Sequence, residues 1–474
     1  MPSLPEPPDQ SGIADVGLIG LAVMGQNLAL NLADHGHTVA VFNRTGTVTT
    51  AFLKEHPEIG LIGATTLAGL VAALGTPRRI VLMVKAGTAV DQTLDALLPL
   101  LEPGDVVIDG GNSFWRDTER RERTARAAGI RFLGVGISGG EEGARHGPSI
   151  MPGGDASGWP EVREMLQGIA AKTDDGTACC DWIGPGGSGH YVKMIHNGIE
   201  YGDMEVIAEA YQLMQGMGWP TDQIADVFGR FGKGRLDSYL IGITAEILRR
   251  RDADGTPLVE KILDRAGQKG TGKWAVDAAL DLGQPLTMIA EAVFARVISS
   301  FKEDRMMAAE ILVGPADARY ELSESDIEDA LYGSKIVSYA QGFMLLAAAS
   351  SAYGWDLDLA AVAPLWREGC IIRAAFLDDI TAAYRRNPSL INLMLDPFFA
   401  DALTRCQAGW RRTVAAAITA GLPVPAYASA LAFYDSYRSA RLPANLIQAQ
   451  RDYFGAHTYE RVDRPSGEFF HTDW

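Results

Sequence analysis

The fold is decided by one stretch of this chain, DVGLIGLAVMG at residues 15–25. Residues Asp15–Ile19 form a short apolar run typical of a buried strand, and helical spacing begins around Gly25. A second apolar run, Thr38–Phe42, follows that helical segment. We expect a β-α-β unit, because Gly20 permits the tight turn after the strand and Gly25 permits close packing of the helix on it.

The glycine turn is typical of a dinucleotide site, since the following helix presents free backbone N–H groups and its positive dipole end to a pyrophosphate. Ala22 stands where the usual fingerprint has its middle glycine, which weakens the motif, but the flanking strand and helix support it. Where a site for NAD would place an acid, about twenty residues on, the chain has Asn43, Arg44 and Thr45. A cation and a hydroxyl suit a 2′-phosphate, so the pattern favours NADP over NAD. The alternative is that Arg44 is an ordinary surface residue of a turn.

The alternation of strands and helices continues to about residue 180, with further candidate strands at Arg79–Val84, Asp105–Ile108 and Arg131–Gly134. Beyond Gly187, long segments with helical spacing continue to about residue 440. We expect an α/β Rossmann-type N-terminal domain with a parallel sheet, followed by a large all-α domain and a short C-terminal tail. The expected boundaries are a leader at 1–12, a dinucleotide-binding domain at 13–186, a helical domain at 187–440 and the tail at 441–474.

Composition and charge narrow the class of protein. The chain has 474 residues, 47% of them hydrophobic and 21% charged, which fits a globular protein of two or three domains. Its 42 Lys and Arg against 59 Asp and Glu give a formal charge of −17, which disfavours DNA or RNA as the main partner. Four cysteines, two of them adjacent, do not suggest a disulfide framework, so we expect a reducing cytoplasm.

Two segments bear on membranes and export. The leader at 1–12 carries several prolines and lacks the apolar core of a secretory signal, so we expect it to be disordered. Between Lys335 and Asp356 there is no charged residue, but the stretch includes Ser338 and Gln341 among many small residues. We therefore expect a buried helix there and no membrane span.

Two further strand ends are expected to form walls of one crevice, because ligands of doubly wound sheets lie beyond the carboxyl ends of the strands. These ends are residues 84–87 and 109–113. The glycine-rich run from Ser138 to Gly154 offers many backbone donors with little steric bulk. We expect this run to be a loop in contact with substrate.

The segment 189–201 is the most informative part of the chain. Read as a helix, it places Lys193, His196, Asn197 and Glu200 on one stripe, with Tyr201 beside it. Lys193 and Glu200 are then roughly 10 Å apart along the axis, which suits a base and an acid acting on one sugar-sized substrate. Interior glycines at 198 and 202 each cost about 1 kcal/mol relative to alanine, which suggests close approach and function. The alternative is a solvated polar face.

Other cationic residues are less clear. Residues 267–274 closely match the sequence motif of a phosphate-binding P-loop. However, Trp274 stands where the motif has the hydroxyl residue that binds magnesium, and the preceding segment is predicted to be a helix and not a strand. ATP binding is therefore not expected. Lys269 remains a candidate for contact with a phosphate. Arg296, Arg451 and His457 are isolated in the sequence, and a surface role is the default for each. The aromatic C-terminus is either covered by a partner or frayed.

These residues resemble the decarboxylating 6-phosphogluconate dehydrogenases of the pentose phosphate pathway. The similarity runs from Val16 to the last residue and is most specific at residues 20–27, 138–145, 193–203, 267–274 and 452–459. The resemblance implies that Lys193 is a general base and Glu200 a general acid, with no metal required. Lys193 must then be neutral to take the proton of the C3 hydroxyl, so its pKa has to fall from about 10.4 toward about 7–8.

The resemblance also implies the remaining site residues. The NADP site would comprise Gly20, Leu21, Ala22, Val23, Met24, Gly25, Asn43, Arg44, Thr45, Val84, Lys85 and Ala86, with Asn112 near both cofactor and substrate. The 6-phosphogluconate would meet Asn112, Ser138, Gly139, Gly140, His196, Asn197, Tyr201, Lys269 and Arg296. Arg451 and His457 would come from the C-terminal tail of the second subunit of a homodimer.

Three other classes remain open at this point. They are a dinucleotide-binding module without catalysis, an ATP-dependent phosphotransferase and a different β-hydroxyacid dehydrogenase. The presence of Lys193 and Glu200 disfavours the first class. The four residues Lys269, Arg296, Arg451 and His457 together suit a phosphorylated substrate better than a short hydroxyacid.

Overall fold

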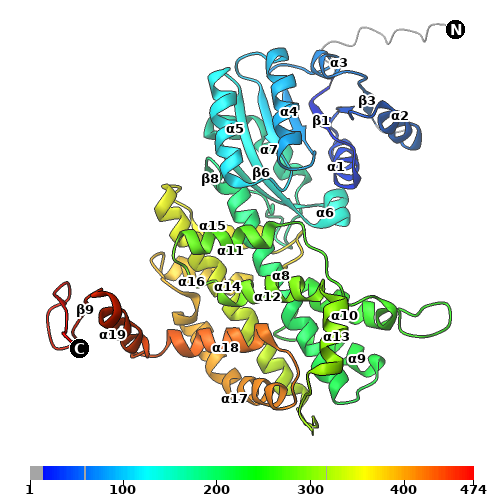
Figure 1. The fold of residues 1–474 in the computed structure, drawn as a ribbon. Coiled ribbons are helices and arrows are strands. Elements are labelled where there is room, and N and C mark those ends of the chain that lie inside the picture. The colour runs from blue at the N-terminus through cyan, green and yellow to red at the C-terminus, as the bar shows by residue number, and fades with distance from the viewer. Residues whose placement is uncertain (1–13, 58–59, 317) are drawn as a thin grey trace.

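The structure, a computed structural model, describes residues 14–57, 60–316 and 318–474, so the leader at 1–12 lies outside the described residues. An α/β unit lies at one end of the molecule, a helical unit follows, and the C-terminal segment projects from the helical unit (Figure 1). This arrangement confirms the predicted fold class.

Within the described residues the main sheet has eight strands in the order β3-β2-β1-β4-β5-β6-β7-β8. All neighbouring pairs are parallel except β6 and β7, which are antiparallel. The direction of progression reverses between β1 and β4, which is where doubly wound folds bind dinucleotides. The strands are β1 (Val16–Ile19), β2 (Val39–Phe42), β3 (Leu61–Gly63), β4 (Arg79–Leu82), β5 (Val106–Asp109), β6 (Arg131–Ser138), β7 (Ser149–Gly154) and β8 (Gly184–Pro185).

Helices cover both faces of this sheet, and each face has its own buried cluster. Val16 and Leu18 of β1 belong to one cluster, whereas Ile19 belongs to the other. A parallel sheet buried on both faces explains why its strands read as continuous apolar runs in the sequence. The helices of this unit are α1 (Val23–Asp34), α2 (Gly46–Glu55), α3 (Leu67–Ala72), α4 (Thr88–Leu97), α5 (Trp115–Ala127), α6 (Gly140–His146) and α7 (Trp159–Ile169).

The five strands expected from the sequence are present, but the expected glycine-rich loop is not. Residues 140–146 form α6, and 149–154 form strand β7. The small residues of β7 serve close packing, because a Cβ at Gly153 would lie 2.5 Å from the backbone nitrogen of Gly189. The prediction of one continuous substrate loop through Gly154 is therefore wrong beyond its first residues.

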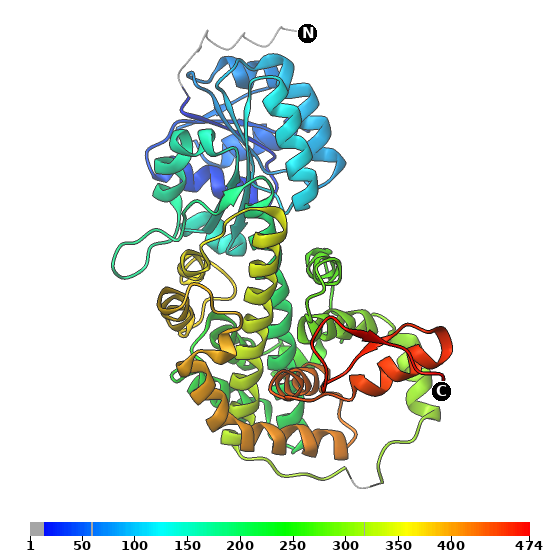
Figure 2. The same cartoon turned by 90° about the vertical axis from the view of Figure 1, so that its left-hand side faces the viewer.

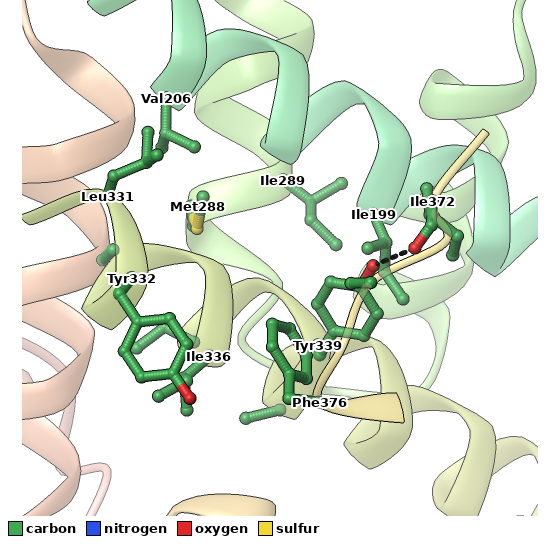
Figure 3. Packing of buried hydrophobic residues seen from close by; sticks show 14 of the residues in the cluster. Ile199, Val206, Met288, Ile289, Leu331, Tyr332, Ile336, Tyr339, Ile372 and Phe376 are labelled. Atoms are coloured by element: carbon green, nitrogen blue, oxygen red, sulfur yellow. Dashed lines mark hydrogen bonds between the residues drawn. The ribbon is translucent and has the colours of Figure 1, made fainter. Parts of the chain in front are cut away.

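The helical unit is built around two long helices, α8 (Ser188–Gly216) and α14 (Glu324–Tyr353), which run side by side (Figure 2). Ile199 and Val206 of α8 pack in the same cluster as Leu331 and Ile336 of α14 (Figure 3). The surrounding helices are α9 (Thr221–Phe231), α10 (Tyr239–Arg249), α11 (Thr271–Asp281), α12 (Thr287–Ser299), α13 (Lys302–Ile311), α15 (Leu359–Val362), α16 (Leu377–Arg386), α17 (Pro397–Thr419) and α18 (Pro425–Tyr437).

Helix α14 accounts for most of the uncharged stretch, and its Ser338 and Gln341 are buried, as expected. No helix in the described part of the chain combines the length and the apolar character that a membrane span needs.

The C-terminal tail is folded. Pro443 immediately precedes helix α19 (Ala444–Gly455), and strands β9 (Tyr459–Glu460) and β10 (Phe469–Phe470) pair antiparallel. The buried carboxylate of Asp452 accepts hydrogen bonds from the backbone nitrogens of Thr458 and Thr472 and from the indole of Trp474. These bonds tie the last residue of the chain to α19.

Candidate active site

A cavity of about 420 Å³ lies beyond the carboxyl ends of β1, β2 and β4. Its position is the one expected for a dinucleotide in a doubly wound sheet. The predicted cofactor residues that line it are Gly20, Ala22, Asn43, Arg44, Thr45, Val84 and Lys85.

The glycine turn between β1 and α1 has no room for side chains at its two glycines. Gly20 has a φ of 102°, and a Cβ there would lie 2.4 Å from the carbonyl oxygen of Met83. A Cβ at Gly25 would lie 1.9 Å from the carbonyl oxygen of Gly20. Ala22 is the N-cap of α1 and provides no side-chain cap, so the first-turn N–H groups of α1 are left for a ligand. This turn fits a pyrophosphate.

Asn43 has a structural role that the sequence did not reveal. Its Oδ1 accepts a hydrogen bond of 3.1 Å from the backbone nitrogen of Leu21. The end of β2 is thereby tied to the glycine turn. Arg44, the next residue, is exposed at the rim of the cavity, where a 2′-phosphate could reach it.

A second cavity of about 700 Å³ lies on the other side of the first turn of α1. Met24 borders it, whereas Gly20 and Ala22 border the first cavity. The predicted residues that line the second cavity are Asn112, Ser138, Gly139, Gly140, Lys193, Asn197, Glu200, Tyr201, Lys269 and Arg296. The structure therefore brings ten residues from five separate segments of the chain into one site.

Helix α8 carries the central part of this site and sits directly on the sheet. A Cβ at Gly136 of β6 would lie 2.4 Å from the Cβ of Lys193, and a Cβ at Gly189 would lie 2.4 Å from the carbonyl oxygen of Met151. The interior glycines 198 and 202 also mark close approaches, as expected: a Cβ at Gly202 would lie 2.7 Å from the Oγ of Ser338.

The polar stripe of α8 is buried, so the alternative of a solvated face is wrong. Lys193 is 6% exposed and His196 is fully buried. The Nζ of Lys193 lies 3.4 Å from Nδ1 of His196, and Nε2 of His196 lies 3.1 Å from the Oγ of Ser138. The same Nδ1 is 3.1 Å from Oδ1 of Asn197 and 4.0 Å from Oε2 of Glu200. His196 thus stands between the proposed base and the proposed acid, behind the cavity wall.

Burial shifts the titration of this stripe. Desolvation lowers the pKa of Lys193 from 10.5 to about 8, although Glu200 opposes the shift. Desolvation also raises the pKa of Glu200, against the effects of Lys193 and Arg296. A lysine whose pKa is lowered beside a carboxyl group whose pKa is raised is the pattern of a paired general base and general acid.

The far end of the second cavity is cationic. The guanidinium carbon of Arg296 lies 3.6 Å from the ring centroid of Tyr201, and Lys269 is exposed at the cavity. Thr271 begins α11 immediately after Gly270, whose φ is 93°. Two cations and a helix N-terminus suit a phosphate.

Two expectations about this end require correction. The segment before Gly267 contains only a short 3-10 helix, Leu258–Lys261, and residues 262–266 are irregular. Arg296 is not a mere surface residue, since it lines the cavity. Met24, predicted for the cofactor site, lines the second cavity instead. Sequence reasoning missed Ile137, Gly267, Gln268, Thr271 and Ile371 as lining residues. The position of Thr271 at the end of a glycine-rich run was a signal for it.

Some predicted residues are not brought to a cavity wall. Leu21, Val23, Gly25 and Ala86 flank the lining residues, and His196 lies behind them. Arg451 and His457 are exposed on the tail and line neither cavity. The Nη1 of Arg451 donates to Gln448, and the ring of His457 packs on Phe454.

Comparison with known proteins agrees with this geometry over the whole chain. Residues 15–184 match the family described as the NAD binding domain of 6-phosphogluconate dehydrogenase, and residues 189–474 match the 6-phosphogluconate dehydrogenase C-terminal domain. The decarboxylating 6-phosphogluconate dehydrogenase of Treponema pallidum is 56% identical, with 97% of each chain covered. The enzyme of that name from Homo sapiens is 54% identical, covering 97% of this chain and 96% of that one.

A solved structure is also similar. It is the 6-phosphogluconate dehydrogenase of Plasmodium falciparum, described in its apo form, with its cofactor NADP+ and with its substrate 6-phosphogluconate. It is 43% identical to this chain, covers 97% of it and 100% of its own length, and superposes with a TM-score of 0.92.

Proposed function

The chain belongs to the 6-phosphogluconate dehydrogenase family, and from this premise we propose how its own residues carry out the reaction. The protein is an NADP-dependent oxidoreductase that converts 6-phospho-D-gluconate to D-ribulose 5-phosphate, CO2 and NADPH. The single observation that supports our assignment of residues is the pair Lys193 and Glu200 in the wall of a cavity bordered by Met24 of α1, with the buried His196 behind them.

The two cavities would bind different ligands. The cavity of about 420 Å³ would bind NADP and is called the cofactor cavity, and the cavity of about 700 Å³ would bind 6-phosphogluconate and is called the substrate cavity. The glycine turn of α1, residues Asn43 to Thr45 and the loop at Val84 would hold NADP, which when bound would accept the hydride that leaves C3 of the substrate. The phosphate of 6-phosphogluconate would lie among Lys269, Arg296 and Tyr201, at the cationic end of the second cavity. Its carboxylate end would then lie toward Ser138, Gly139 and Asn112.

Lys193 is the proposed general base and then a general acid. In its neutral form it takes the proton of the C3 hydroxyl while the hydride leaves the same carbon. The product is a 3-keto acid, and Lys193 now carries the proton. When the C–CO2 bond breaks, its electron pair moves to the ketone, and Lys193 returns its proton to the ketone oxygen to give an enediol.

Glu200 is the proposed acid of the last step. Because burial raises its pKa, it can hold a proton that it delivers to C1 of the enediol, which yields the ketose. His196 touches both the Lys193 ammonium and the Ser138 hydroxyl, so it orients the base against the sheet.

We also propose a homodimer in the cytoplasm in which each tail completes the site of the partner subunit. The apolar side chains of the tail support this proposal: Tyr453 is 71% and Phe454 is 72% exposed in the single chain. Arg451 and His457 lie on the same segment. Four buried free cysteines suit a reducing compartment.

The reaction is tested by mixing the protein with 6-phosphogluconate and either NADP or NAD in the presence of a chelator. Reduced nicotinamide and CO2 should appear in equal amounts, much faster with NADP. Reduced cofactor without CO2 would contradict the decarboxylation.

Tail exchange is tested with two inactive variants, Lys193→Met and Arg451→Ala, co-expressed with different tags and purified as the heterodimer. If the tail acts in the partner, each heterodimer contains one complete site and shows about half of the wild-type rate. If the tail acts in its own subunit, no complete site forms and activity stays low.

A further inference from the structure

Arg121 of α5 is a buried cation that lines neither cavity, yet it contacts the loops of both. Its side chain is 1% exposed. Its Nε donates to Oδ1 of Asp91 at 2.8 Å, and its Nη2 donates to the carbonyl oxygen of Gly87 at 3.0 Å. Its Nη1 lies 3.4 Å from the Oγ of Ser113 and 3.5 Å from Oδ2 of Asp109.

The two loops that Arg121 contacts carry residues of different cavities. Gly87 ends the loop whose Val84 and Lys85 line the cofactor cavity. Residues 109–113 form the loop whose Asn112 lines the substrate cavity. The second loop is closed on itself, since Ser113 donates to Oδ2 of Asp109 at 2.6 Å. One guanidinium group therefore bonds a loop that contributes to each cavity.

The same helix also holds α8. The Oγ1 of Thr118 lies 2.7 Å from Nδ1 of His190, which is fully inside the protein and one turn before Lys193. Helix α5 thus fixes the cofactor loop, the Asn112 loop and the start of the helix that carries the base.

We propose that Arg121 is a positioning residue for hydride transfer, which sets the separation between bound NADP and C3 of the substrate. The planar guanidinium has donors in a fixed fork, so it imposes a geometry that a single ammonium group cannot reproduce. The loops it joins carry residues that line different cavities. A mutation far from the reacting atoms that misplaces them by about 1 Å can lower a rate about a hundredfold. This inference rests on the proposed function.

The test compares Arg121→Met and Arg121→Lys with the matched control Arg120→Met. Arg120 is the neighbouring residue on α5 and also donates to Asp91, at 2.9 Å, but it is 49% exposed and bonds neither loop. The measurements are KM for NADP, kcat, the dissociation constant of NADPH from fluorescence, and the kinetic isotope effect with 6-phosphogluconate deuterated at C3.

We expect Arg121→Met to raise KM for NADP about tenfold, to lower kcat about tenfold and to increase the isotope effect, because hydride transfer becomes slower. Arg121→Lys should be intermediate, and Arg120→Met should stay within about twofold of wild type. A merely structural role would reduce the folded fraction, and hence kcat, but would leave KM and the isotope effect unchanged.

The proposal is overturned if folded Arg121→Met keeps the wild-type KM and isotope effect, or if Arg120→Met shows the same changes. If Arg121→Met does not fold, Arg121→Lys decides in the same way. An inactive wild-type protein would instead contradict the proposed function, so the two failures are distinguishable.

Discussion

The two cavities on either side of α1 are built in opposite ways. The cofactor cavity is formed by the ends of strands, and its cations Arg44 and Lys85 are exposed. The substrate cavity is lined by side chains of helices on a sheet, and the proposed base and acid in it are shielded from solvent: Lys193 is 6% exposed and the Glu200 side chain is 23% exposed. Only at its cationic end does this cavity carry an exposed charge, that of Lys269.

This difference separates recognition from chemistry. An exposed cation keeps its water and its charge, so it can attract a phosphate without changing its own protonation. Burial destabilises the charged form of a lysine, and because this lowers its pKa, the lysine can release a proton near neutral pH. Substitutions of the exposed cations in the first cavity should therefore change affinity, whereas those of Lys193 and Glu200 in the second should change the rate.

The largest effect is expected for Lys193→Met. Removal of the proposed general base should lower kcat by about 10³–10⁴-fold. The dissociation constant of NADPH should stay within about twofold, since Lys193 is not part of the cofactor cavity. Steady-state kinetics and a fluorescence titration measure the two quantities.

A comparison with Lys85→Met sharpens this result, because Lys85 is the exposed lysine of the cofactor cavity. That variant should change KM for NADP and leave kcat within about threefold. In the wild type, kcat/KM should fall about tenfold per pH unit below about 8, where Lys193 becomes protonated. Equal losses of kcat in Lys193→Met and Lys85→Met would contradict the assignment of chemistry to one cavity and cofactor recognition to the other.

The substitution Lys193→Met should also stabilise the fold at neutral pH. The pKa of Lys193 is lowered from 10.5 to about 8, so between these values the unfolded chain binds more protons and stability rises with pH. Below about pH 8 the buried charge costs about 3 kcal/mol, and methionine removes this cost.

The free energy of unfolding in urea, measured at equal protein concentration, checks this prediction. Lys193→Met should exceed the wild type by about 3 kcal/mol at pH 7, and the difference should vanish as pH approaches 10.5. A difference that does not depend on pH would show that better packing, and not the buried charge, is responsible.

Glu200→Gln should have the next largest effect, a fall in kcat of about a hundredfold. The amide has the shape of the carboxyl group but cannot deliver a proton to the enediol. NADPH affinity should not change, because Glu200 lines the substrate cavity. If the kcat of Glu200→Gln is within tenfold of wild type, another group, such as water, delivers the proton to the enediol.

The sequence predicted the fold class because the strand runs, the glycine turn and the helical spacing after residue 187 are local signals. It also predicted that Lys193, His196 and Glu200 share a stripe, since that follows from helix geometry alone. Strand β7 was missed because its small residues make room for α8, a helix from a later part of the chain that packs against the strand.

Long-range contacts explain the other gaps. The bond from Leu21 to Asn43 joins residues 22 positions apart, and Arg121 reaches back 34 positions to Gly87. No local pattern marks such pairs, because each depends on how the strands are ordered in the sheet. The roles given to Arg451 and His457 stay predictions, since in the single chain both lie outside the two cavities.

The smallest effect is expected in the cofactor cavity, for Arg44→Ser. The loss of one exposed cation from a 2′-phosphate contact should raise KM for NADP about tenfold, which corresponds to about 1.4 kcal/mol. KM for NAD should stay within about twofold, because NAD has no phosphate for Arg44 to bind. Steady-state kinetics with both cofactors measure the ratio, and Arg44→Lys should retain most of the preference. If KM rises equally for both cofactors, Arg44 supports the turn after β2 and not the phosphate, and the cofactor cavity would then owe its preference for NADP to other residues.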